Sequence, residues 1–212
     1  MLNKKYSVNN LWLISIYYRE YGPFTMEELA ERAKKREFGW DMYVYRLPKD
    51  NVWRPARDIP ETREILLNNF PLQHGDMGPA GGYVFKLKDK TGLYELSPAD
   101  AGYCPWENAE NICKHFSFNG FNDWRFPSLK ELSASAAFIN AQIREERSVE
   151  HANENIFHWS NERKNQTAAT AVITCIDKNK KNDLVIGRDT SLPVKEWHHV
   201  RPVRDLTKTP PL

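Results

Sequence analysis

Cysteine and histidine, the side chains that most often bind metals or act as nucleophiles, are few in this chain of 212 residues. Cys104, Cys113 and Cys175 form no C-x-x-C pair, and their odd number argues against a disulfide framework or a zinc site. His198 and His199 are adjacent, so a strand would point them to opposite faces, where they would not chelate one metal. The sequence therefore predicts no metal centre and no cofactor.

The most distinctive stretch, residues 123–128, reads D-W-R-F-P-S and is followed by Glu131. Ser128 and Glu131 form a capping box, which predicts the start of a helix. Trp124 is then available for the core, and Arg125 can pair with a buried carboxylate or with backbone carbonyls. We interpret this stretch as structural. No catalytic triad order, carboxylate pair or phosphate loop stands out, so we expect no enzyme activity.

Candidate ligand-binding residues lie between Trp159 and Trp197, where polar loops alternate with strand-like runs. A rigid sheet with exposed connections places recognition groups accurately. Arg and Trp are the residue types most common at binding hot spots. The predicted ligand-binding residues are Arg163, Asn165, Arg188, Lys195 and Trp197. A calcium-dependent sugar site is an alternative, and its candidate oxygen ligands are Glu154, Asn155, Asn161 and Glu162.

Charge and hydropathy exclude several classes of protein. Lys and Arg number 30 and Asp and Glu 28, and the two signs are mixed along the chain. This pattern lacks the basic footprint of a nucleic-acid-binding protein. The apolar run 11–18 is too short to span a bilayer, and no small-residue cleavage site follows it. We expect a cytoplasmic protein without a membrane span.

The elements that would position these residues fall into two groups, which predicts an α+β fold in two domains. The first group is a strand at 11–18, a turn at Tyr21-Gly22-Pro23, a helix capped by Thr25 and Glu28, a strand at 42–46 and a helix at 60–68. The second group is a strand pair at 82–88 and 93–97, helices at 105–116 and from Ser128, and an antiparallel sheet of strands at 157–160, 168–176, 184–188 and 199–203. Gly and Pro crowd the segment 69–80, so we place the boundary there, with domains at 1–70 and 76–206 and a tail at 207–212.

The first group resembles the bacterial branch of the GYF-domain family over roughly residues 11–66. The resemblance rests on Trp12, on the Y-G-P-F-T run at 21–25, on Glu28-Leu29 and on the W-R-P-A run at 53–56. It implies a small adaptor module for protein–protein contacts. The expected adaptor surface consists of Trp12, Tyr21 and Phe24.

The second group resembles bacterial domains related to the C-terminal domain of a collagen-like adhesin, which share the C-type-lectin-like fold with formylglycine-generating enzymes. The landmarks are the G-P-A-G-G run at 78–82, the run from Asp123 to Leu132, Trp159-Ser160 and the V-R-P-V-R run at 200–204. The resemblance implies a non-catalytic protein that recognises a protein or glycan ligand. Two alternatives stay open, namely a variable ligand-binding protein of a diversity-generating retroelement and a formylglycine-generating-enzyme-like oxidase.

Overall fold

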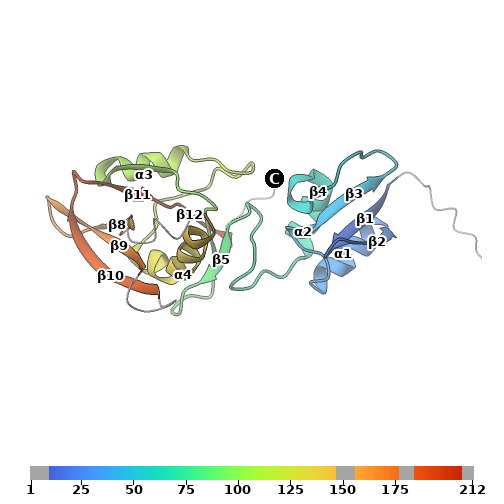
Figure 1. Ribbon diagram of the computed structural model, residues 1–212, viewed down its shortest axis with the longest axis horizontal. Coiled ribbons are helices and arrows are strands. Elements are labelled where there is room, and N and C mark those ends of the chain that lie inside the picture. Colours follow the sequence, from blue (N-terminus) through green and yellow to red (C-terminus); the bar gives the residue numbers. More distant parts are fainter. Residues whose placement is uncertain (1–9, 147–155, 177–183, 207–212) are drawn as a thin grey trace, which may run out of the picture. The chain divides into compact units, whose positions relative to one another are not determined.

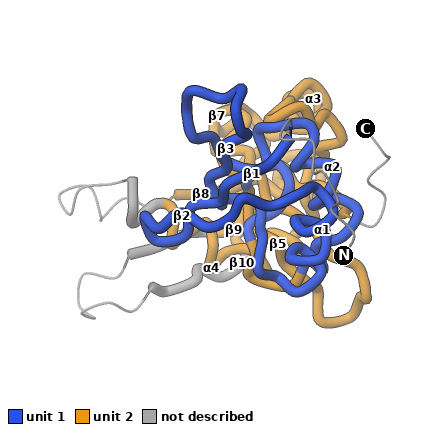
Figure 2. The backbone as a smooth tube through the Cα atoms, turned by 90° about the vertical axis from the view of Figure 1, so that its right-hand side faces the viewer, with its two compact units in different colours: residues 1–72, 77–81 blue, residues 73–76, 82–212 orange. Residues whose placement is uncertain are grey.

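The computed structural model describes residues 10–146, 156–176 and 184–206 (Figure 1). The chain divides into two compact units (Figure 2), with residues 1–72 and 77–81 in unit 1 and residues 73–76 and 82–212 in unit 2. Each unit contains both helices and antiparallel strand pairs, so the fold belongs to the α+β class. Among the described residues, no helix is long and apolar enough to cross a membrane.

Unit 1 is built on a four-stranded antiparallel sheet with the strand order β2-β1-β3-β4. Its strands are β1 (Leu11–Ile16), β2 (Arg19–Phe24), β3 (Tyr43–Leu47) and β4 (Arg54–Pro55). Its helical segments are α1 (Met26–Lys34), the 3-10 turn η1 (Ala56–Asp58) and α2 (Pro60–Asn69). The core contains Trp12, Ile14, Leu29, Trp40 and Leu66.

The expected turn at Tyr21-Gly22-Pro23 is instead part of strand β2, and the chain reverses earlier, at Tyr17 and Tyr18. Both of these tyrosines have positive φ, 49° and 63°, the combination that a two-residue hairpin turn needs. Pro23 is tolerated because β2 is an edge strand. Gly22 is required because its φ is +120° and a Cβ there would lie 2.7 Å from the carbonyl oxygen of Trp12.

The capping box of α1 is formed as the sequence predicts. The Thr25 hydroxyl accepts from the backbone N–H of Glu28, and the Glu28 carboxylate accepts from the backbone N–H of Thr25 at 2.8 Å. These bonds satisfy two donors at the end of the helix that would otherwise lack partners. The helix then buries Leu29 and Ala33.

The Gly- and Pro-rich segment is partly tied into unit 2 by backbone hydrogen bonds. The N–H of Gly75 donates to the carbonyl of Val84 and the N–H of Val84 donates to the carbonyl of Asp76, both at 2.8 Å. Residues 73–76 therefore group with unit 2, whereas residues 77–81 group with unit 1.

Unit 2 contains two sheets, a five-stranded one with the order β10-β9-β8-β11-β7 and a three-stranded one with the order β12-β6-β5. The five-stranded sheet consists of β7 (Gly102–Pro105), β8 (Ile156–Arg163), β9 (Ala168–Ile176), β10 (Leu184–Pro193) and β11 (Trp197–Val200). The three-stranded sheet consists of β5 (Tyr83–Lys86), β6 (Leu93–Leu96) and β12 (Val203–Asp205). The pairing of β8 with β11 is parallel, which departs from the purely antiparallel sheet that the sequence predicts.

Two helices, α3 (Trp106–His115) and α4 (Leu129–Glu146), pack against opposite faces of the larger sheet. Ala109 and Cys113 of α3 pack with Trp159 and Ala171, whereas α4 packs with the neighbouring Val172. Successive residues of β9 thus face different helices, as the alternation of side chains in a strand requires.

The D-W-R-F-P-S stretch leads into the capped start of α4, as its capping box predicts. Arg125 donates both of its terminal nitrogens to Glu131, at 2.9 and 2.6 Å, which confirms the expected carboxylate partner. The Glu131 carboxylate also accepts from the backbone N–H of Ser128 at 2.8 Å. Trp124 is buried and donates to the carbonyl of Phe121.

The predicted strand at 199–203 is two strands that belong to different sheets. Strand β11 ends at Val200 and β12 begins at Val203, with Arg201 and Pro202 between them. Proline has no N–H for a strand ladder, so the chain leaves the first sheet there. The side chain of Arg201 turns inward, to the carboxylate of Asp100.

Candidate functional site

Large apolar side chains that are exposed to solvent mark two regions of the described chain. In unit 1 they are Tyr17, Tyr18, Tyr21, Tyr43 and Val52. In unit 2 they are Tyr103 and Trp197, each 55% exposed. Exposed aromatic rings that gather on a rigid element are candidates for recognition, because they offer contact area with little loss of side-chain entropy on binding.

The unit 2 pair belongs to neighbouring strands, β7 and β11, in which His199 lies opposite Tyr103 and Trp197 opposite Pro105. Tyr103, Trp197 and His199 therefore share one face of the sheet, and we call these three residues the aromatic strip. The ring centroids of Tyr103 and Trp197 are 6.0 Å apart, and those of Tyr103 and His199 are 5.1 Å apart. Each ring of the strip thus restricts the position of its neighbour.

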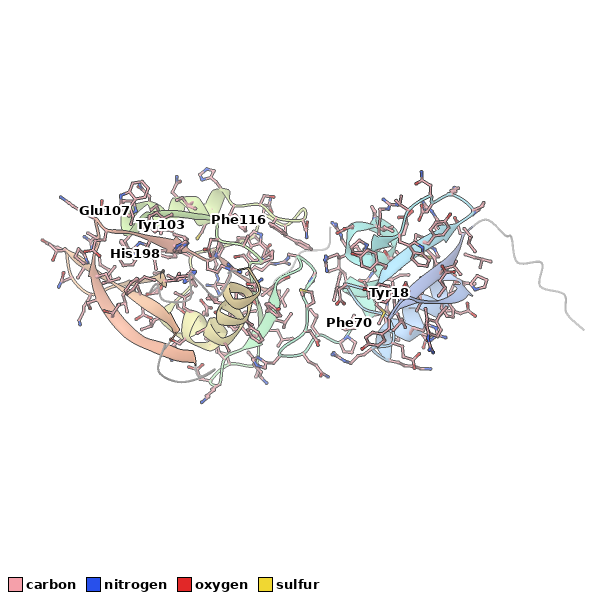
Figure 3. The ribbon with its side chains drawn as sticks, viewed as in Figure 1. Tyr18, Phe70, Tyr103, Glu107, Phe116 and His198 are labelled. Atoms are coloured by element: carbon pink, nitrogen blue, oxygen red, sulfur yellow. The ribbon has the colours of Figure 1, made fainter. Side chains whose placement is uncertain are left out.

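The opposite face of the same strands is a packed core. His198, labelled with Tyr103 in Figure 3, has its ring 4.7 Å from that of Trp159 and 5.1 Å from that of Phe157. Trp159 is fully buried and donates from Nε1 to the carbonyl of Cys104 at 3.0 Å. Burial lowers the pKa of His198. The aromatic strip is therefore presented by a rigid sheet.

The side chain of Asp100, in the connection between β6 and β7, lies at the centre of a polar network behind the strip. Its Oδ2 is 2.8 Å from Nδ1 of His199, and its Oδ1 is 3.2 Å from Nε2 of His158. Oδ1 also accepts from Nη1 of Arg201 at 3.0 Å. One carboxylate thereby joins strands β8 and β11 to the β6–β7 connection.

Electrostatics fixes the protonation of this network. Burial alone would raise the pKa of Asp100, but hydrogen bonds from His158 and His199 and the charge of Arg201 outweigh it and hold the pKa well below its usual range. The carboxylate is therefore ionised, and both imidazoles donate to it. Burial lowers the pKa of His158, which keeps that ring neutral with a bare Nδ1. Because Nδ1 of His199 faces Asp100, Nε2 is the ring nitrogen of this residue that is left for other partners.

Arg201 anchors the network to the rest of unit 2. It donates to the carbonyl oxygens of Ser97 and Pro98, at 2.9 and 3.0 Å, and to the side-chain oxygen of Gln142 on α4. A buried guanidinium with this many partners holds the Asp100 carboxylate in one place.

The five predicted ligand-binding residues are dispersed, and only Trp197 belongs to the aromatic strip. Lys195 is exposed in the turn before β11. Arg163 and Asn165 shape the β8–β9 turn, because Arg163 donates to the carbonyl of Asn165 and Asn165 Oδ1 accepts from the N–H groups of Thr167 and Ala168. The side chain of Arg188 lies outside the described residues.

A small pocket of about 420 Å³ lies next to the start of α3. It is lined by Trp106, Glu107, Glu110, Lys114, Arg125, Phe126 and Asn161. Of the proposed calcium ligands only Asn161 lines it, while Glu154 and Asn155 lie outside the described residues. In the described part of the chain, no group of three or more His, Cys, Asp or Glu side chains is arranged to hold a metal.

The expected adaptor surface of unit 1 needs correction. Trp12 is only 1% exposed and lies in the core, because Trp12 and Ile14 point from β1 toward the helices. Phe24 is half-buried, with the guanidinium of Arg32 4.2 Å from its ring centroid. Tyr21 remains exposed on the edge strand.

Sequence reasoning missed Tyr103, His199, Asp100 and Arg201 as a site. Strand β7 is four residues long and was not predicted, so Tyr103 had no expected neighbour. His199 and Arg201 lie 99 and 101 positions from Asp100, beyond any local pattern. The one signal in the sequence was that adjacent residues of a strand point to opposite faces, which separates His199 from His198.

No protein-family model matches the chain, and no curated protein matches it. The functional assignment therefore rests on the geometry of the site.

Proposed function

We propose that the protein is a non-catalytic recognition protein whose unit 2 binds a protein or glycan ligand through the aromatic strip. The observation that carries this proposal is the exposure of Tyr103 and Trp197, at 55% each, on a sheet whose other face is a packed core. Tyr and Trp are enriched where proteins bind partners, because their rings combine apolar area with a hydrogen-bonding group.

The Asp100 network supports a positioning role behind this surface. The carboxylate fixes the ring of His199 through Nδ1, which leaves Nε2 of that ring to a hydrogen-bonding group of the ligand. Tyr103 adds a hydroxyl donor and Trp197 an indole N–H. Such a mixture of flat apolar faces and hydrogen-bonding groups suits a sugar ring or a peptide.

The surroundings of the described cysteines favour binding over thiol chemistry. Cys104 and Cys113 are free and buried. Burial raises the pKa of Cys113 to about 12, so its thiol stays protonated at neutral pH and is a poor nucleophile. Free thiols also support our proposal of a cytoplasmic location. Cys175 lies on β9 with its side chain outside the described residues.

For unit 1 we propose an adaptor role through its exposed tyrosines. Strand register brings Tyr21 and Tyr43 to the hairpin end of the sheet, since Tyr21 lies opposite Ile14 and Tyr43 opposite Ser15. Tyr17 and Tyr18 form the hairpin turn itself. We call Tyr17, Tyr18, Tyr21 and Tyr43 the tyrosine end.

The test is binding of the full chain to a glycan array and to a displayed peptide library, followed by titration of the best binder. Trp197→Ala and Tyr103→Ala should each weaken binding at least roughly tenfold, the loss typical of a hot-spot aromatic. Val52→Ala is the matched control, because Val52 is 54% exposed but belongs to neither the aromatic strip nor the tyrosine end. Unchanged binding in both strip variants would refute the proposal.

A further inference from the structure

An open groove of about 1020 Å³ lies in unit 2. It is lined by His74, Lys86, Leu87, Lys88, Asp89, Leu129, Lys130, Ser133 and Ala134. None of these residues belongs to the aromatic strip, so the groove is a separate feature. Its volume is at the upper end of the range for pockets that bind small molecules.

The floor of the groove is apolar. Leu87, only 4% exposed, follows strand β5, and the half-buried Leu129 and Ala134 come from the first turns of α4. An apolar floor of this kind gains free energy when it is covered by an apolar group of a ligand. One part of the ligand should therefore be a hydrocarbon chain or ring.

The rim of the groove carries an excess of positive charge. Lys130 is neutralised by Asp89, with 2.8 Å between Nζ and Oδ2. Lys86 and Lys88 are exposed and form no ion pair with any other described residue. The local excess of two positive charges attracts an anion.

His74 adds a positioned donor to the same rim. Its Nδ1 accepts the backbone N–H of Lys86 at 3.3 Å, so Nε2 must carry the ring proton. The ring is also held in place by Phe138, whose centroid is 5.4 Å away. The groove thus combines an apolar floor with a rim made mostly of hydrogen-bond donors.

We infer that this groove binds a small amphipathic anion, a molecule with an apolar body and a carboxylate or phosphate head group. The apolar body would cover Leu87, Leu129 and Ala134. The head group would pair with Lys86 and Lys88 and accept from His74.

The experiment is a calorimetric titration of the full chain with octanoate, 1-octanol and acetate. Octanoate has both a hydrocarbon tail and a negative charge, octanol has the tail alone, and acetate has the charge without a long tail. We expect saturable one-to-one binding of octanoate and at least roughly tenfold weaker binding of the other two, since each lacks one of the two contributions.

Three variants locate the site. The double variant Lys86→Gln and Lys88→Gln should weaken octanoate binding roughly fivefold, whereas Lys90→Gln should change it less than roughly twofold. Lys90 is the matched control, because it lies in the same β5–β6 connection as Lys88 but its ammonium lies over the ring of Tyr94, outside the groove. Ser133→Phe adds bulk at an exposed groove position and should abolish binding without unfolding unit 2.

The inference is wrong if octanol binds as tightly as octanoate, if Lys90→Gln is as harmful as the double variant, or if octanoate does not saturate. Vesicles of phosphatidylglycerol provide a further arm. Binding to vesicles that depends on Lys86 and Lys88, with no binding of free octanoate, would identify a membrane-surface contact and overturn the small-molecule assignment.

Discussion

The tyrosine end of unit 1 and the aromatic strip of unit 2 expose similar residues on different supports. Tyr17 and Tyr18 are 93% and 103% exposed on a turn with positive φ, so their backbone carries the strain of a left-handed conformation. Tyr103 and Trp197 rest on each other and, through His199, on a half-buried carboxylate. The same chemical groups are thus presented by a tight turn in one unit and by a polar network in the other.

The difference has a consequence for how each region responds to change. Truncating a turn tyrosine removes few contacts, whereas disturbing Asp100 leaves two imidazoles and a guanidinium without their shared acceptor. The aromatic strip should therefore be sensitive to substitutions and to pH at positions that touch no ligand. The tyrosine end should respond mainly to changes at its own turn.

The largest expected effect distinguishes a core tryptophan from a surface one. Trp12→Ala should destabilise unit 1 by about 3–5 kcal/mol, because it opens a cavity in the core. Trp197→Ala should destabilise unit 2 by less than about 1 kcal/mol. Thermal unfolding, with hydrogen exchange as the readout in each unit, measures both losses of stability. Equal losses would contradict the assignment of Trp197 to an exposed strip.

A second substitution tests the support of the strip. Asp100→Ala should destabilise unit 2 by about 3 kcal/mol, since it leaves the buried guanidinium of Arg201 without its carboxylate. Asp89→Ala is the control, because Asp89 pairs with Lys130 at an exposed site and its loss should have a much smaller effect on stability. Urea unfolding of the two variants gives the comparison. A small effect at Asp100 would show that the network does not hold the strip.

The two units should also differ in their response to pH. Burial lowers the pKa of His158, so between its folded and unfolded pKa values the unfolded state binds more protons. Unit 2 should therefore lose stability as the pH falls below about 6.5, by up to about 1.4 kcal/mol per pH unit for this group.

Unit 1 is the internal control for this prediction, because residues 1–72 and 77–81 contain no histidine. Hydrogen exchange of β8 and β11 amides, measured from pH 5 to 7.5 and corrected for intrinsic rates, should show this slope of stability against pH. The β1 amides should not show it. His158→Gln should flatten the slope in unit 2. A slope that survives this substitution unchanged would assign it to other groups.

The smallest expected effect concerns the strained turn. Replacing Tyr17→Asn and Tyr18→Gly together should stabilise unit 1 by about 1 kcal/mol, because these residues adopt positive φ more readily than tyrosine. Exchange protection of β1 and β2 amides measures the gain. The same variant should lose any partner that unit 1 binds through the tyrosine end. A loss of stability would mean that the tyrosines contribute contacts that outweigh the strain.

Local patterns in the sequence predicted much of the architecture. The capping boxes at Thr25 and Ser128 gave the starts of two helices, and periodic apolar residues gave most of the strands. These signals act between residues a few positions apart, so one stretch of chain contains all of the information. The α+β class follows from the order of these elements. The tight turn at Tyr17-Tyr18 was missed because tyrosine is not one of the residue types that favour turns.

The candidate site depended on tertiary structure. Asp100, His158 and His199 come from separate segments, and only the pairing of β8 with β11 brings the two histidines to one carboxylate. The sequence predicts a binding surface for both Trp12 and Trp197, yet one is buried and the other exposed. Exposure is decided by which elements pack over a face of a sheet, and that packing involves residues far apart in the chain.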